Sequence, residues 1–190
     1  MVQPRADDTK AATPSAVAGA GSGPPSHPPG TVRTCVVGVS EMAVSTRPDE
    51  VLVTYSLGSC VGLALYDPEL GIGGLVHCML PTSNLDALKA QDTPCMFADT
   101  GVQALLKAVF DLGARRKQLV AKVAGAATHC DPAGRFRIGE RNHAVVRKIL
   151  WKNDILIAAE DVGGDLPRTL TLYMDTGKVV VRRRGMLLDL

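Results

Sequence analysis

Residues 54–80 read TYSLGSCVGLALYDPELGIGGLVHCML and contain two apolar runs separated by a polar turn. The runs VGLALYD and GIGGLVHCML have the length and composition of strands, and the Asp-Pro-Glu sequence at 67–69 between them is typical of a turn. We therefore expect two neighbouring strands, with the chain returning along its own path. This arrangement would bring the end of the second run back beside the start of the first.

Further short apolar runs lie on both sides of this stretch. VRTCVVGV and VLVTYSL precede it, and LVAKVAGAA and DILIAAEDV occur later in the chain. Near the C-terminal end, RTLTLYM and KVVVRRR flank the sequence DTG, which predicts a β-hairpin. The sequence therefore predicts a strand-rich domain with at least some antiparallel pairing.

Two segments have the periodicity of helices. Between residues 99 and 112 the apolar side chains recur at helical spacing, with Asp99-Thr100 as the expected cap and Gly113 at the end. The segment 137–153, RIGERNHAVVRKILWKN, carries a second apolar face. Strands interspersed with helices predict an α/β fold, here a layered α-β sandwich of mixed or antiparallel sheets with two main helices.

The N-terminal residues 1–30 differ in composition from the rest of the chain. They are rich in Ala, Pro, Gly, Ser and Thr and end in GAGSGPPSHPPG. Such a segment has too little apolar surface to offset the entropy that ordering costs. We expect a disordered tail over 1–30 and one domain over 31–190, because 46% hydrophobic and 21% charged residues are ordinary globular values.

Composition also excludes several functional classes. A formal net charge of +2 with 4% aromatic residues predicts no nucleic-acid partner. No run approaches the roughly 20 apolar residues of a membrane-spanning helix, and no signal-peptide pattern is visible, so we expect no membrane insertion. The five cysteines lack CxxC spacing, and their odd number favours free thiols in a cytoplasmic protein over a disulfide framework.

Cys60 is the candidate nucleophile because it directly follows the small residues Gly58 and Ser59. Backbone N–H groups at such a turn can raise the thiolate fraction and stabilise an oxyanion. His77 would return beside Cys60 if the two runs are neighbouring strands, and imidazole exchanges protons near neutral pH. Thr54 could hold the imidazole in one tautomer. These residue types suit acyl transfer at a carboxamide or an ester.

Other interpretations of the same residues are structural. Cysteine is often a buried packing residue, and a strand histidine is often a satisfied core residue. The pairs His77-Cys78 and His129-Cys130 also resemble metal ligands, but adjacent strand residues point to opposite faces, and neither CxxC nor HxxxH spacing occurs. We therefore expect no metal site, and we expect the remaining cysteines to be packing residues or incidental thiols.

Six motifs occur in a recognisable order. They are LGSCVGLALYDP, GGLVHCMLP, FADTGV, IGERN, AEDVGG and TGKVVVRR. In this order they resemble the CheD family of chemoreceptor glutamine deamidases, from about Cys35 to Arg184. The resemblance implies a layered α/β deamidase fold with a Cys-His pair and a supporting threonine, which fall on Cys60, His77 and Thr54. One departure is Ala-Gly-Ala-Ala at 124–127, where the family commonly has Gly-Gly-Ala.

The resemblance also implies a function. It implies hydrolysis of glutamine side-chain amides on methyl-accepting chemotaxis receptors, through a cysteine thioester and without a cofactor or metal. A CheC-type phosphatase is the further partner that it implies. Two alternatives stay open at this point: an adaptor that binds receptors and a CheC-type phosphatase with little catalysis, and a different thiol acyl-transferase such as a protease or a transglutaminase.

Overall fold

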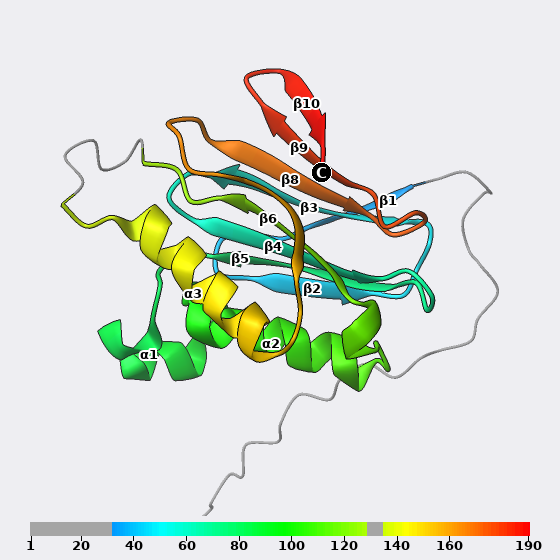
Figure 1. The fold of residues 1–190 in the computed structure, drawn as a ribbon, viewed down its shortest axis with the longest axis horizontal. Coiled ribbons are helices and arrows are strands. Elements are labelled where there is room, and N and C mark those ends of the chain that lie inside the picture. The colour runs from blue at the N-terminus through cyan, green and yellow to red at the C-terminus, as the bar shows by residue number, and fades with distance from the viewer. Residues whose placement is uncertain (1–31, 129–134) are drawn as a thin grey trace, which may run out of the picture.

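The computed structural model describes residues 32–128 and 135–190. Two β-sheets and a layer of helices form a three-layer arrangement, with one sheet in the middle (Figure 1). This architecture confirms the expected layered α/β fold. The segment 1–30, expected to be a disordered tail, and the pair His129-Cys130 lie outside the described residues.

One sheet, here called the outer sheet, forms the face of the molecule opposite the helices (Figure 1). Its five strands lie in the order β1 (Arg33–Val36), β3 (Glu50–Leu57), β8 (Arg168–Tyr173), β9 (Val179–Arg183) and β10 (Met186–Asp189). Strands β1 and β3 are parallel, and the other neighbours are antiparallel. The expected C-terminal hairpin is the antiparallel pair β8 and β9.

The central sheet lies between the outer sheet and the helices. Its strands lie in the order β2 (Met42–Ser45), β5 (Ile72–Cys78), β4 (Val61–Asp67), β6 (Val120–Gly125) and β7 (Ile157–Val162). Only β6 and β7 pair in parallel. Every residue of β4 and β5 is buried, because the outer sheet covers one face and the helices cover the other.

Two long helices, α2 (Ala98–Asp111) and α3 (Ile138–Lys152), pack on the central sheet, as expected (Figure 1). The short elements are η1 (Ser83–Leu85), α1 (Ala87–Asp92), η2 (Pro94–Met96) and η3 (Arg116–Gln118). One core cluster lies between the helices and the central sheet, and the second lies between the two sheets. The catalytic candidates belong to the layer between the sheets.

The expected cap of the first long helix is wrong. Helix α2 has Phe97 at its N-cap, without a side-chain cap, and Asp99 lies inside the first turn. The Asp99 carboxylate accepts hydrogen bonds from the backbone N–H and the hydroxyl of Ser83 instead. A carboxylate in the first turn still faces the positive end of the helix dipole, so Asp99 stabilises the helix start from a different position.

Candidate active site

The β4–β5 hairpin places His77 next to the loop that carries Cys60. The two strands are antiparallel, with Gly62 opposite His77 and Val61 opposite Cys78. Cys60 immediately precedes β4, and alternation along the chain places it on the same face as Gly62 and His77. The turn that the sequence predicts is held by Asp67, whose side chain accepts hydrogen bonds from two backbone N–H groups of the turn.

Thr54 reaches His77 from the other sheet. The Thr54 Oγ1 atom lies 2.7 Å from His77 Nδ1, and both residues are 0% exposed. Thr54 belongs to β3 of the outer sheet, whereas His77 belongs to β5 of the central sheet. The contact therefore crosses the layer between the sheets and fixes the orientation of the imidazole ring.

The other imidazole nitrogen has a different environment. His77 Nε2 is buried and makes no hydrogen bond with any residue that the structure describes. Burial lowers the pKa of His77 to about 4, so the ring is neutral at physiological pH. If Nδ1 donates its proton to Thr54 Oγ1, the lone pair of Nε2 can accept a proton from a thiol.

The low pKa of His77 predicts a specific dependence of stability on pH. The unfolded chain binds a proton at this ring below about pH 6.5, whereas the folded chain does so only below about pH 4. Stability should therefore fall as pH falls through this window, by about 1.4 kcal/mol per pH unit or about 3 kcal/mol in all.

Replacing His77 by glutamine should remove this contribution. We expect the free energy of unfolding in urea to fall between pH 7 and pH 4 by about 3 kcal/mol more in the wild type than in His77→Gln. Comparing the two proteins cancels the titration of the groups that they share. Identical pH dependence in both proteins would contradict the buried neutral state of His77.

The loop before β4 turns as expected. Ser56, rather than Gly58, has a positive φ of 59°, and the β3–β8 pairing shifts register between Thr54 and Leu57. Residues 58–60 then form a bend. Within the described residues the backbone N–H of Ser59 has no hydrogen-bond acceptor, so it is a candidate donor to an oxyanion.

The loop is anchored by the end of β6. Ala126 N–H donates to the carbonyl oxygen of Cys60 at 2.7 Å, and Ala127 N–H donates to that of Gly58 at 2.8 Å. Gly125 makes this close approach possible: its φ is +106°, and a Cβ atom there would lie 2.3 Å from the Cys60 carbonyl oxygen. In the sequence, residues 124–127 stand out only as a departure from the family, so this support was not predicted.

We expect Gly125→Ala to displace the Cys60 backbone and to lower the rate of the chemical step at Cys60 at least about 100-fold. Gly113→Ala is the matched control, because Gly113 has a similar φ of +103° but no atom within 4 Å of its would-be Cβ. Both variants carry the strain of alanine at positive φ, and only Gly125→Ala adds the clash. Activities that are equal in the two variants would show that the clash is harmless.

Cys78 lies on the opposite face of β5 from His77, as the strand alternation predicts. Its side chain packs toward α2, where a Cβ on Gly101 would lie 2.8 Å from Cys78 Sγ. Burial raises the pKa of the Cys78 thiol and of Cys95, and it also raises that of Cys35, with a smaller contribution from the nearby Glu50. None of the four described cysteines forms a disulfide.

These environments predict selective chemistry at Cys60. A raised thiol pKa lowers the thiolate fraction at neutral pH, and only the thiolate reacts quickly. We expect iodoacetamide at pH 7 to modify Cys60 at least about tenfold faster than Cys35, Cys78 or Cys95 in the folded protein. Peptide mass spectrometry of a time course provides the measurement, and labelling of Cys78 at the same rate would contradict the assignment.

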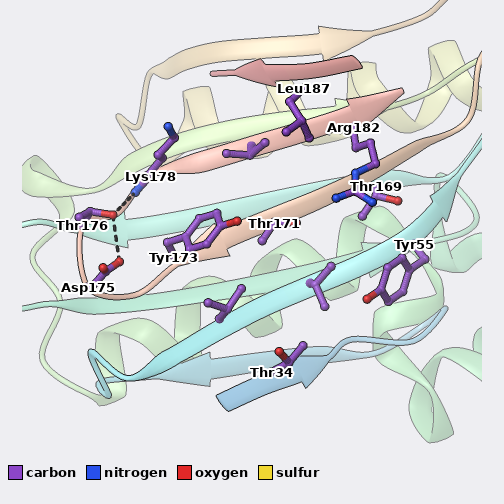
Figure 2. Close-up of a pocket in the computed structure, with 13 residues that line it drawn as sticks. Thr34, Tyr55, Thr169, Thr171, Tyr173, Asp175, Thr176, Lys178, Arg182 and Leu187 are labelled. Carbon is purple, nitrogen blue, oxygen red and sulfur yellow. Dashed lines mark hydrogen bonds between the residues drawn. The ribbon is translucent and has the colours of Figure 1, made fainter. Parts of the chain in front are cut away.

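A large groove lies on the face of the outer sheet that points away from Thr54 and His77. Its volume is about 620 Å³. Figure 2 shows the side chains that line it on the outer face of β3, β8 and β9. Tyr55 lines this groove, whereas Thr54, the preceding residue, faces the layer between the sheets. Neither Cys60 nor His77 lines it, so the groove is separate from the candidate active site.

The described residues offer neither a membrane-spanning helix nor a cluster of metal ligands. Residues 32–128 and 135–190 contain no helix long and apolar enough to cross a membrane. In the same part of the chain, no group of three or more His, Cys, Asp or Glu residues is arranged to hold a metal ion.

Comparisons with known proteins agree with one another. The model of the CheD family, described as CheD chemotactic sensory transduction, matches residues 79–183. A probable chemoreceptor glutamine deamidase CheD 1 of Syntrophus aciditrophicus is 49% identical over 150 residues, which cover 79% of this chain and 94% of the relative. A probable chemoreceptor glutamine deamidase CheD of Solibacter usitatus is 46% identical over 150 residues, which cover 79% and 89%.

Among solved structures, the hypothetical protein YfiH of Bacillus licheniformis is similar at 16% identity with a TM-score of 0.40. The match covers 63% of this chain and 49% of that protein. This likeness is too slight to carry any argument about function.

Proposed function

The chain belongs to the CheD family, and from this premise we propose that it is a glutamine deamidase whose substrates are chemoreceptors. The reaction converts a glutamine side-chain amide and water into glutamate and ammonia. A thiol, an imidazole and backbone donors can perform it without a metal or an organic cofactor. The observation that carries the assignment of residues is the contact of Thr54 with a buried, neutral His77 on the face that Cys60 shares.

The first half of the reaction forms a thioester. His77 Nε2 accepts the proton of Cys60, and the thiolate attacks the carbon of the amide, so that a C–S bond forms and the carbonyl oxygen becomes an oxyanion. The backbone N–H of Ser59 is the leading candidate to stabilise this charge, because that of Gly58 donates to the Ser56 carbonyl oxygen. When the C–N bond breaks, His77 gives its proton to the departing ammonia.

The second half returns the enzyme to its starting state. Water attacks the thioester while His77 removes one of its protons, the C–S bond breaks, and the Cys60 thiolate leaves and takes that proton back from His77. In this mechanism the Thr54 hydroxyl oxygen accepts a hydrogen bond from Nδ1–H, which keeps Nε2 as the nitrogen that exchanges protons in both halves. Thr54 is thus a positioning residue, whereas Cys60 and His77 exchange bonds and protons with the substrate.

The test uses the purified chain with a receptor cytoplasmic fragment that contains glutamine residues. We expect release of free ammonia together with the mass increase of one amide-to-acid conversion at each modified site. Cleavage of the fragment would instead indicate a protease, and incorporation of an added primary amine would indicate a transglutaminase. The deamidase proposal would be overturned by either cleavage or amine incorporation, if no ammonia were released in the absence of an added amine.

The remaining parts of the proposal concern location and partners. We propose that the chain acts in the cytoplasm, where receptor cytoplasmic segments are accessible to it. The family resemblance also supports a CheC-type phosphatase as a second partner. An adaptor with little catalysis would bind these partners equally well without Cys60, and this difference is tested below.

A further inference from the structure

We propose that Asn142 of α3 is a positioning residue that holds the Cys60 loop and the end of the His77 strand in one fixed arrangement. The Nδ2 group of Asn142 donates to the carbonyl oxygen of Ser59 at 2.9 Å and to that of Met79 at 3.0 Å. Ser59 immediately precedes the nucleophile, and Met79 follows β5, the strand that carries His77. This inference rests on the proposed function of the same site.

The two hydrogen bonds act at a gap that the strand pairing does not close. The ladder between β4 and β5 ends at the pair Val61 and Cys78. Beyond that pair the chains diverge, because Met79 N–H donates to Met96 and the Cys60 carbonyl oxygen accepts from Ala126. A single amide group from the third layer therefore connects the two segments at the point where the reacting side chains must align.

Packing alone does not explain an asparagine at this position. Asn142 is 0% exposed, and its Oδ1 atom is buried without a hydrogen-bond partner among the described residues. An unsatisfied buried oxygen destabilises the folded state, whereas leucine, of similar volume, would add no such cost. The two hydrogen bonds that the amide donates explain why asparagine occupies this position, because leucine cannot donate them.

The start of α3 packs close enough to the Cys60 loop for the Asn142 side chain to contact it. Gly139 lies one turn before Asn142 on the same helix face. A Cβ atom at Gly139 would lie 2.4 Å from the Ala126 carbonyl oxygen, so the helix packs directly on the segment that anchors Cys60. Helix α3 thus supports the nucleophile loop both through backbone contact and through the Asn142 side chain.

A positioning role affects the chemical step more than substrate binding. Misplacing a nucleophile relative to its base by a fraction of an ångström lowers the rate of bond formation, while contacts with the rest of the substrate remain. We therefore expect Asn142→Ala to lower kcat for receptor deamidation about 10- to 100-fold with KM unchanged. The alkylation of Cys60 by iodoacetamide should also slow in this variant, since it depends on the same thiolate.

Asn153→Ala is the matched control. Asn153 lies at the C-terminal end of the same helix, and its Nδ2 group donates to the Ile149 carbonyl oxygen at 2.9 Å. Its removal also costs an amide-to-carbonyl hydrogen bond, but at the end of α3 away from Ser59 and Met79. We expect Asn153→Ala to lower the melting temperature while leaving kcat and the Cys60 alkylation rate at wild-type values.

The experiment measures kcat, KM, the Cys60 alkylation rate and the melting temperature for wild type, Asn142→Ala, Asn142→Leu and Asn153→Ala. Asn142→Leu keeps the volume of the side chain and serves if the alanine variant does not fold. Wild-type kcat and alkylation in Asn142→Leu, or equal losses in the Asn142 and Asn153 variants, would overturn the positioning role. A wild type that releases no ammonia would overturn the proposed function instead, and the alkylation rates would still decide the role of Asn142.

Discussion

Cys60→Ala is expected to lower ammonia release from a receptor fragment by about 10⁴-fold or more, to the level of the reaction without enzyme. The sulfur atom forms the bond that replaces the amide C–N bond, and alanine has no atom that can do so. The alanine side chain fits in place of the half-buried cysteine, so the fold should be retained. The measurement is ammonia release together with the mass of the receptor fragment.

The control separates catalysis from binding. Cys35→Ala removes another partly buried thiol, on β1 of the outer sheet, and should retain full activity. Cys60→Ala should still bind the receptor fragment, because binding requires no covalent step. If Cys60→Ala retained deamidation, the nucleophile would lie elsewhere. If deletion of the chain abolished signalling in a cell but Cys60→Ala did not, the result would favour the adaptor function.

Sequence patterns predicted the part of the site that depends on neighbouring strands. The β4–β5 hairpin follows from two apolar runs around Asp67, and strand alternation then places Cys60 and His77 on one face and Cys78 on the other. These are local relations of period and turn chemistry. The fold class could be predicted for the same reason, because each strand and each long helix carries its own periodic pattern.

The sheet to which each strand belongs could not be predicted. β3 and β4 are separated only by residues 58–60, yet β3 lies in the outer sheet and β4 in the central sheet. The irregularity at Ser56, with its positive φ, lies where the chain leaves one sheet for the other. A serine does not signal such a conformation, so the contact of Thr54 with His77 across the sheets is visible only in the structure.

Asn142 had a signal that the sequence analysis did not use. It precedes Val146 and Leu150 on one stripe of α3, and both of these residues are buried. A polar side chain on a buried stripe must find hydrogen-bond partners, which makes it a candidate for a structural or functional contact. Its partners, Ser59 and Met79, belong to distant parts of the chain, and no periodicity could have identified them.

His77→Ala is expected to lower the rate of deamidation by about 10³- to 10⁴-fold, nearly as much as loss of the nucleophile. The imidazole has two tasks in the reaction: it removes the Cys60 proton and protonates the departing ammonia. Because burial holds its pKa at about 4, His77 is present as the neutral base throughout the physiological pH range. Steady-state ammonia release with the receptor fragment provides the measurement.

The double variant Cys60→Ala/His77→Ala tests whether these residues act as one unit. We expect it to be no slower than Cys60→Ala, because a base without a nucleophile has no proton to remove on the reaction path. Thr54→Val should cost less than either single change, since it removes only the hydroxyl that orients the ring at 2.7 Å. Independent, multiplicative losses in the double variant would mean that His77 stabilises the reaction by a route that does not pass through Cys60.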